Sequence, residues 1–263
     1  MEQPEFIFFK RTARRLLDIN LDGYKRPQVQ RRLKNYLLRS GYPNWPTYFR
    51  AMKNDPMELA RLRDYLTINV TSFFRDPKKY GFLRETIFPK LLDGHPKLRV
   101  WSAGCSRGHE PYSLAIALAE TTSLYRKHQI LATDIDGAAL AFAQDGGPYS
   151  PDDVANVSPP LLERYFKVDG DNYRVAESLK RKIDFGYHNL LDDPIEGGFD
   201  LIVCRNVVIY FTAEAKTKLY KRFGAALRPG GVLFVGGTEI ISNAREIGLE
   251  SAGHSFYYRN LED

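Results

Sequence analysis

The chain has 263 residues, which suffice for one large domain and a smaller helical one. With 43% apolar and 27% charged residues and no low-complexity tract, its composition excludes fibrous and disordered classes. No apolar run approaches the roughly 20 residues that span a bilayer, and residues 1–10 lack the basic segment followed by an apolar segment of a secretory signal. The two cysteines are too few for a disulfide framework or a metal site. We therefore expect a cytoplasmic protein without membrane insertion or bound metal.

The net charge of +6 is unevenly distributed along the chain. Residues 1–63 hold 14 Lys and Arg against 6 Asp and Glu, whereas the remaining 200 residues hold 24 against 26. The basic segment of residues 1–63, here called the basic head, precedes a nearly neutral remainder of the chain, and such a distribution favours an acidic binding partner. The alternative is that these charges only solvate a helical surface.

The first 70 residues are predicted to form a small helical domain. Val29, Leu33, Tyr36 and Leu37 recur at helical spacing, and Gly41 follows as a helix stop. Two shorter helices are expected over 46–53 and 56–66. The predicted substrate-recognition residues form a row of cations away from the apolar face or on its flank: Arg31, Lys34 and Arg39.

Residues 71–97 are expected to be a linker with a helix, and from residue 98 short apolar runs alternate with helical stretches. Strands are predicted over 98–103, 129–133, 183–187, 201–204 and 232–235, and helices over 111–125, 137–144 and 213–227, with Pro229-Gly230-Gly231 ending the last helix. This alternation predicts an α/β fold, a parallel sheet with helices on both faces. Residues 246–259 should add two edge strands.

The alternation fails between about residues 146 and 182. There two short apolar segments flank Asp169-Gly170-Asp171-Asn172, the signature of a β-hairpin. We interpret this stretch as a small inserted β-subdomain.

A glycine-bearing turn follows the first predicted strand, where ligands bind in open α/β sheets. Gly104 and Gly108 allow a close backbone approach, but their spacing is not that of a pyrophosphate-binding turn. Glu110 instead favours a cationic guest, such as the ammonium group of a bound amino acid.

Asp134 ends the second strand, where a carboxylate can accept both hydroxyl hydrogens of a ribose. The alternative is that Asp134 caps the following helix. An ammonium and a ribose without a phosphate describe S-adenosylmethionine.

Two further turns are expected at the same edge of the sheet. Asn189 and Leu190 follow the third strand. The Asn189 amide can hydrogen-bond to the edge of an adenine and Leu190 can pack on its ring, although an Asx turn at Asn189 is an equal alternative. Cys204, Arg205 and Asn206 follow the fourth strand and would face the sulfonium. Cys105 and Cys204 are interpreted as small buried hydrophobic residues.

Several segments resemble the CheR-type methyltransferases that esterify glutamate side chains of chemotaxis receptors. The matching segments are residues 66–76 (the family's T-x-N-x-T-x-F-F-R), 105–112 (S-T-G-E-E-P-Y), 134–136, 189–191, 204–211 and 230–234. The likeness covers about 240 residues in register.

The resemblance implies a Rossmann-like class I methyltransferase domain over 98–263 and a receptor-recognition role for residues 1–70. It implies S-adenosylmethionine as the cofactor, S-adenosylhomocysteine as the product, and the cytoplasmic helical bundle of chemoreceptors as the partner. The implied cofactor contacts are Asn69, Thr71, Arg75, Gly104, Glu110, Asp134, Asn189, Leu190, Cys204, Arg205 and Asn206. It also places Arg75 and Tyr210 beside the transferring methyl group as catalytic residues.

One departure from the family concerns the turn after the first strand. Where relatives carry Thr-Gly-Glu-Glu, this chain has Arg107-Gly108-His109-Glu110, and we interpret His109 as an exposed turn residue. The hairpin loop is short, which favours a member that needs no receptor tether peptide.

Two other function classes are compatible with these residues. A nucleic-acid methyltransferase would use the basic head on phosphates, but the turn after the fourth strand lacks an Asn-Pro-Pro-Tyr type of motif. A non-catalytic sensor would bind the cofactor and signal through the head. We expect a monomeric enzyme that does not bind nucleic acid.

Overall fold

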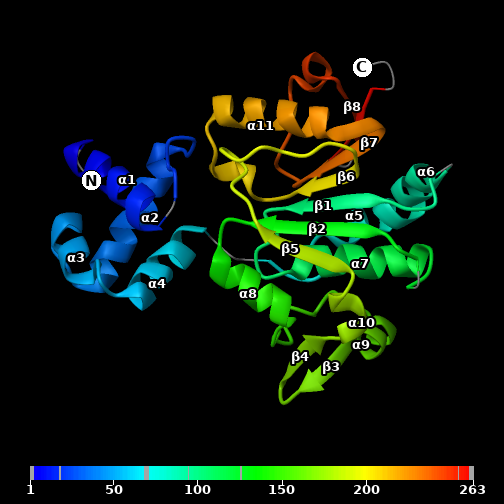
Figure 1. Ribbon diagram of the computed structural model, residues 1–263, viewed down its shortest axis with the longest axis horizontal. Coiled ribbons are helices and arrows are strands. Elements are labelled where there is room, and N and C mark those ends of the chain that lie inside the picture. Colours follow the sequence, from blue (N-terminus) through cyan, green and yellow to red (C-terminus); the bar gives the residue numbers. More distant parts are fainter. Residues whose placement is uncertain are drawn as a thin grey trace. The chain divides into compact units, whose positions relative to one another are not determined.

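The computed structural model describes residues 3–17, 19–67, 71–93, 95–124, 126–253 and 255–260. The chain divides into two compact units, one of residues 1–69 with 210–217 and the other of residues 70–209 with 218–263 (Figure 1). Among the described residues, no helix combines the length and apolar character that crossing a membrane requires.

The first unit is helical. Its helices are α1 (Gln3–Leu17), α2 (Arg26–Ser40), α3 (Trp45–Met52) and α4 (Pro56–Thr67). Helix α2 ends at Gly41, whose φ of 74° is the left-handed conformation that glycine adopts without strain. Asn44 caps α3 by accepting a hydrogen bond from the Thr47 backbone at 2.9 Å.

The core of this unit is largely aromatic. Trp45 is fully buried and lies within 4.4 Å of Phe9, centroid to centroid, and the rings of Tyr48 and Phe49 pack on it. Val29 and Leu33 bury the predicted apolar face of α2 against this core. Large aromatic surfaces let a short bundle bury enough apolar area to fold.

A segment distant in sequence completes the first unit. The Lys25 amide donates to the Tyr210 carbonyl at 2.8 Å, and the Thr212 amide donates to the Gly23 carbonyl at 2.7 Å. The ring of Phe211 packs edge-on against Tyr24 at 5.0 Å. The helical unit therefore includes residues that follow most of the other unit in the chain.

The second unit is built on a seven-stranded sheet with the order β5-β2-β1-β6-β7-β9-β8. Its strands are β1 (Arg99–Ala103), β2 (Gln129–Asp134), β5 (Ile183–Tyr187), β6 (Phe199–Cys204), β7 (Leu227–Val235), β8 (Leu249–Gly253) and β9 (Phe256–Arg259). The first five are parallel, and β9 pairs antiparallel with both β7 and β8. The predicted α/β class and the two edge strands are confirmed.

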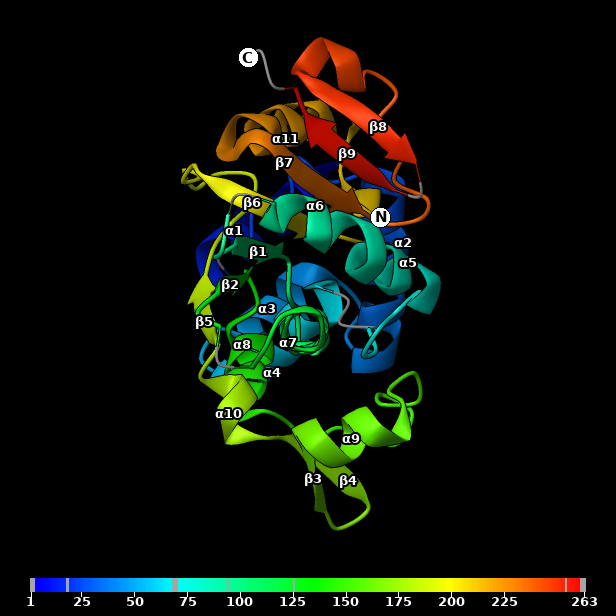
Figure 2. The ribbon, with the colours of Figure 1, turned by 90° about the vertical axis from the view of Figure 1, so that its right-hand side faces the viewer.

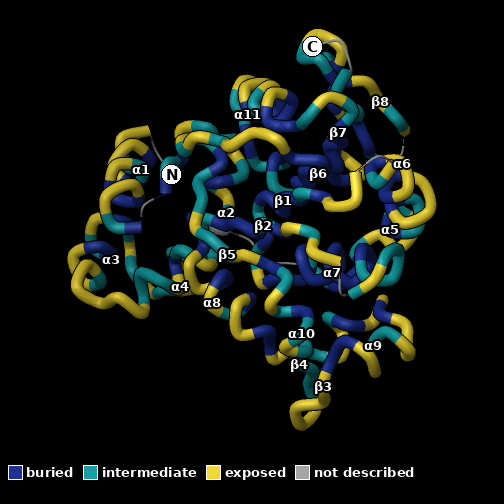
Figure 3. The backbone as a smooth tube through the Cα atoms, turned by 45° about the vertical axis from the view of Figure 1, so that its right-hand side comes forward, coloured by how far each residue is buried: buried dark blue, intermediate teal, exposed yellow. Residues whose placement is uncertain are grey.

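Helices flank this sheet. They are α5 (Pro77–Phe82), α6 (Phe88–Leu92), α7 (His109–Thr121), α8 (Gly137–Asp145) and α11 (Ala213–Ala226), with a π-helical turn over Leu83–Ile87 and 3-10 turns over Val208–Tyr210 and Ala244–Ile247. Helices α7 and α8 pack on β2 and β5, and Figure 2 shows α11 beside β7. Strand β6 is buried along its whole length, as expected for a strand covered on both faces (Figure 3).

The stretch predicted to be an insertion has a two-stranded sheet of its own, and its buried side chains join the core of the second unit. It contains α9 (Pro159–Tyr165), the hairpin of β3 (Phe166–Asp169) and β4 (Asn172–Val175), and α10 (Glu177–Lys180). Figure 3 shows the hairpin tip as exposed. The predicted hairpin is confirmed, with Gly170 at the turn in a left-handed conformation (φ 59°).

One local prediction is wrong. Pro229-Gly230-Gly231 does not end a helix, because α11 already ends at Ala226 and the tripeptide lies inside β7. The pairing of β6 with β7 shifts register between Phe199 and Leu201, and a Cβ on Gly231 would lie 3.0 Å from the Phe199 carbonyl oxygen. The glycine therefore serves close strand pairing at an irregularity.

Candidate active site

The strand order reverses between β1 and β6, which places the carboxyl ends of β1, β2 and β6 at a topological switch point. The turn after β1 is held by β2, because the amides of Gly104 and Cys105 both donate to the Thr133 carbonyl, at 2.8 and 2.9 Å. Gly104 has a φ of 88°, and a Cβ there would lie 2.5 Å from the Val207 side chain. Only glycine fits this turn.

Glu110 lies in the first turn of α7 with its side chain 12% exposed. One carboxylate oxygen accepts the Ser102 hydroxyl at 2.8 Å, and the other lies 3.8 Å from the Arg205 guanidinium. Burial raises the pKa of Glu110, while Arg205 and Ser102 act in the opposite direction. A desolvated carboxylate of this kind is stabilised by a bound cation.

Asp134 ends β2 and is 9% exposed. Its two oxygens accept the amides of Ser106 at 2.7 Å and Asp136 at 2.9 Å, and burial raises its pKa. Asp136, rather than Asp134, caps α8 by accepting the Ala138 and Ala139 amides, each at 3.0 Å. A hydrogen bond from the Ile135 amide also lowers the pKa of Asp134, and the fourth lone pair of the carboxylate remains for a hydroxyl hydrogen.

Asn189 forms the Asx turn that was the alternative interpretation. Its side-chain oxygen accepts the Leu191 amide at 3.0 Å, and its side-chain nitrogen donates to Asp192 at 3.0 Å. Leu190 is buried. The adenine-reading role of these two residues stays a prediction.

Arg205 contacts more residues of the candidate site than its position in the sequence indicated. Its side chain is 3% exposed and donates to the Asp76 carboxylate at 2.5 Å and to the Arg75 carbonyl at 3.0 Å. The guanidinium lies 4.6 Å from the centre of the Phe234 ring. Arg205 thus joins the Arg75–Asp76 turn to Glu110, a link between positions about 130 residues apart.

Glu239 was not predicted and is 3% exposed. One of its oxygens accepts the Gly236 amide at 2.6 Å and the Asn206 amide at 2.9 Å, which ties the carboxyl ends of β7 and β6 together. Asn206 has a φ of 61°, a conformation that needs such support. The signal available in the sequence was an acidic residue soon after the apolar run of residues 232–235.

The exposed placement predicted for His109 is wrong, since this residue is 2% exposed. Its Nε2 lies 3.0 Å from Asp153 Oδ1, and its ring packs on Phe73 and Tyr149 with centroids 5.0 and 4.8 Å away. Residues about 40 positions away, both earlier and later in the chain, cover His109, so the local turn motif could not reveal its burial.

The remaining predicted residues fall in several places. Thr71 and Arg75 are half-buried in the second unit, and Asn69 lies outside the described residues. Tyr210 belongs to the helical unit, and its role beside a transferring methyl group stays a prediction. Cys105 and Cys204 are buried, as interpreted, and burial raises the pKa of both thiols.

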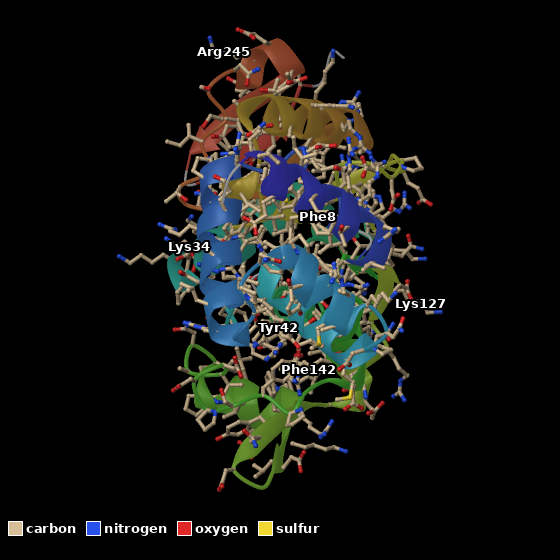
Figure 4. The ribbon with its side chains drawn as sticks, turned by 90° about the vertical axis from the view of Figure 1, so that its left-hand side faces the viewer. Phe8, Lys34, Tyr42, Lys127, Phe142 and Arg245 are labelled. Atoms are coloured by element: carbon tan, nitrogen blue, oxygen red, sulfur yellow. The ribbon has the colours of Figure 1, made fainter. Side chains whose placement is uncertain are left out.

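The three predicted substrate-recognition cations are exposed on α2 of the helical unit, and Figure 4 shows the Lys34 side chain extended away from its helix. These residues are Arg31, Lys34 and Arg39.

Comparison with known proteins identifies this architecture. The family described as "CheR methyltransferase, SAM binding domain" matches residues 69–254, and "CheR methyltransferase, all-alpha domain" matches residues 4–67. A chemotaxis protein methyltransferase of Listeria monocytogenes is 40% identical over 98% of both chains. Chemotaxis protein methyltransferase 1 of Pseudomonas aeruginosa is 33% identical over 91% of both chains.

The matched regions include the switch-point turn, the carboxylates of Glu110 and Asp134, and the helical unit. The chain therefore belongs to the CheR methyltransferase family and is an S-adenosylmethionine-dependent methyltransferase.

Proposed function

We propose that this enzyme transfers the methyl group of S-adenosylmethionine to glutamate side chains of chemotaxis receptors, forming methyl esters. The observation that carries the proposal is a pair of carboxylates at the switch point, Asp134 buried and Glu110 with its side chain only 12% exposed. The relatives of this chain are named chemotaxis protein methyltransferases.

The two carboxylates suit the two polar ends of the cofactor. Glu110 would hold the ammonium group, which would replace part of the solvation that burial removes from this carboxylate. Asp134 would accept a hydrogen bond from a ribose hydroxyl, and the Gly104 turn would let the cofactor approach the backbone. The turn of Cys204, Arg205 and Asn206 would line the same edge.

Bound S-adenosylmethionine supplies a methyl group on a sulfonium and leaves as the neutral thioether S-adenosylhomocysteine. The attacking glutamate has a pKa of about 4.3 and is ionised at neutral pH, so no general base is required. Because charge is lost on the way to the ester, a water-poor site favours the reaction. Arg75 would orient the attacking carboxylate, a contribution through positioning.

The acidic partner that we propose is the cytoplasmic helical bundle of a chemoreceptor. The exposed cations of α2 would attract glutamate-bearing helices and raise the rate of encounter. The hairpin turn contains only Gly170 and Asp171 between its strands, which favours recognition without a receptor tether peptide. We expect the enzyme to act as a monomer.

The test is transfer of a radiolabelled methyl group to receptor-containing membranes. We expect label that mild alkali releases as methanol, because esters are base-labile, and no transfer to duplex DNA or RNA. Glu110→Gln serves as the impaired control. Base-stable label, or label on nucleic acid, would contradict the proposal, and cofactor binding without transfer would favour a sensor.

A further inference from the structure

The segment that carries Arg75 has a strained backbone. Phe74 and Asp76, the two residues that flank it, have φ values of 49° and 64°, in the left-handed region that side chains other than glycine rarely adopt. Such conformations persist only where the surroundings enforce them, and they concentrate at functional sites. The direction of the Arg75 side chain therefore depends on whatever holds this turn.

Part of that support comes from the inserted subdomain. The Phe73 amide donates to the Asp153 carbonyl at 2.9 Å, and the Asn156 side chain donates to the Phe73 carbonyl at 3.4 Å. The Phe74 amide donates to the Ser113 hydroxyl at 2.9 Å. Besides Arg205, which donates to the Arg75 carbonyl at 3.0 Å, the turn thus has two supports, the insertion and α7.

His109 joins these two supports. Its Nε2 lies 3.0 Å from the Asp153 carboxylate, its carbonyl accepts the Ser113 hydroxyl at 2.6 Å, and its ring packs on Phe73. A carboxylate only accepts hydrogen bonds, so Nε2 carries the hydrogen.

Asp153 is a carboxylate at neutral pH. Burial raises its pKa, but hydrogen bonds from His109 and Ser150 outweigh this and bring the pKa to about 2. Its other oxygen accepts both the amide and the hydroxyl of Ser150 at 2.8 Å. Hydrogen bonds to a charged acceptor are stronger than neutral ones, so this pair fixes the inserted segment firmly.

We propose that His109 is a positioning residue: by binding Asp153 it holds the insertion against the strained turn and so aims Arg75 at the substrate carboxylate. This inference rests on the proposed function, because it takes Arg75 as the group that orients the attacking glutamate. It gives the inserted subdomain a role in methyl transfer through the segment of residues 150–157.

The effect should fall on turnover rather than on cofactor affinity. The direct hydrogen bond of Glu110 comes from Ser102, and its link to the Arg75 turn is only the 3.8 Å ion pair with Arg205, which also binds the Arg75 carbonyl. Loss of the His109–Asp153 hydrogen bond would therefore loosen the Arg75 turn while leaving the ammonium site in place.

The experiment uses the full chain with receptor-containing membranes as methyl acceptor. For His109→Leu we expect kcat to fall roughly tenfold or more, since a 1 Å misplacement can cost about a hundredfold. The Kd for S-adenosylhomocysteine, measured by calorimetry, should stay within about twofold of the wild-type value. His109→Gln, whose amide nitrogen can replace Nε2 as donor, should recover most of the lost turnover.

Two further variants separate positioning from general destabilisation. Asp153→Asn removes the charge at a side chain that is 30% exposed, and it should lower kcat selectively even if His109→Leu folds poorly. His128→Leu is the matched control, because half-buried His128 also makes two hydrogen bonds, to the Leu98 amide and the Thr122 hydroxyl, but away from the turn. It should lower Tm with normal kcat.

Several results would overturn the positioning role. These are normal kcat in both His109→Leu and Asp153→Asn, a Gln variant no better than the Leu variant, or product affinity that falls as much as kcat. If instead the wild-type enzyme forms no base-labile methyl product, the proposed function fails whatever the variants do. If the wild-type enzyme forms the ester and the His109→Leu and Asp153→Asn variants have normal kcat, only the positioning role of His109 is disproved.

Discussion

Glu110 is a carboxylate whose burial has a measurable consequence for cofactor binding. Burial raises its pKa, although Arg205 and Ser102 oppose the shift, so it takes up a proton at a higher pH than an exposed glutamate does. The protonated form cannot pair with an ammonium group. We expect affinity for S-adenosylhomocysteine to fall as the pH decreases through this raised pKa, and to be constant above it.

Calorimetric titration across acidic and neutral pH measures this dependence. Glu110→Gln should bind more weakly at neutral pH and should show a shallower pH profile, with the remaining slope due to Asp134, whose pKa burial also raises. An unchanged profile in the Gln variant would remove Glu110 from the ammonium site.

Arg75 can be tested independently of the cofactor. Arg75→Ala should lower kcat by about 10- to 100-fold, the range expected when an orienting group is lost, while the Kd for S-adenosylhomocysteine changes little. Arg75→Lys should recover only part of the turnover, because an ammonium group cannot grip a carboxylate through two parallel hydrogen bonds. A large loss of product affinity with normal turnover would reverse this assignment.

At the scale of single residues, the sequence predicted positions that depend on neighbouring residues and missed contacts between residues far apart in the chain. Asp134 ends an apolar strand and Glu110 lies at the start of the helix after another, so their place at the sheet edge follows from the predicted strand–turn–helix order. The burial of His109 and the roles of Arg205 and Glu239 depend on partners from 33 to 130 positions away. No short-range pattern encodes such contacts.

At the scale of elements, the parallel strands were predicted almost to their ends because each is a short apolar run between helical stretches. The start of β7 was missed, since Pro229-Gly230-Gly231 reads as a break in the chain. These residues fit inside β7 only because the register of its pairing with β6 shifts at this point. That shift is a property of the two paired strands and is not encoded in either strand alone.

Helix α2 presents Arg31, Lys34 and Arg39 to solvent, and this face can be tested by charge reversal. Lys34→Glu should raise the KM for receptor membranes several-fold, more at low ionic strength, because unlike charges attract over about 10 Å at 0.1 M salt. Both kcat and the Kd for S-adenosylhomocysteine should be unaffected.

Lys127→Glu is the control for this experiment. It changes the net charge equally at an exposed lysine that precedes β2 (Figure 4). Equal effects of the two variants would mean that only the total charge matters, as expected if the basic face of α2 serves solvation alone.

For the molecule as a whole, the Asp153 carboxylate links stability to pH. Despite the opposing effect of burial, hydrogen bonds from His109 and Ser150 lower its pKa from 3.8 to about 2 in the folded state. A depressed carboxyl pKa stabilises the fold fully above about pH 4, and this contribution is lost as the pH falls towards 2.

Comparison of wild-type and Asp153→Asn proteins by thermal unfolding tests this linkage. The difference in Tm should be largest at neutral pH and should shrink between about pH 4 and pH 2, where the wild-type carboxylate becomes protonated. A difference that does not vary with pH in this window would show that Asp153 acts through packing instead.

Residues 210–217 belong to the helical unit, and this determines how the unit can be produced as an isolated fragment. A recombinant fragment that stopped near residue 69 would leave Tyr24 without the ring of Phe211, and the Lys25 amide and Gly23 carbonyl without their partners. Apolar surface uncovered in this way favours aggregation. A circular permutant or a linker that supplies the Tyr210–Thr217 peptide in cis is therefore the better route to an isolated helical unit.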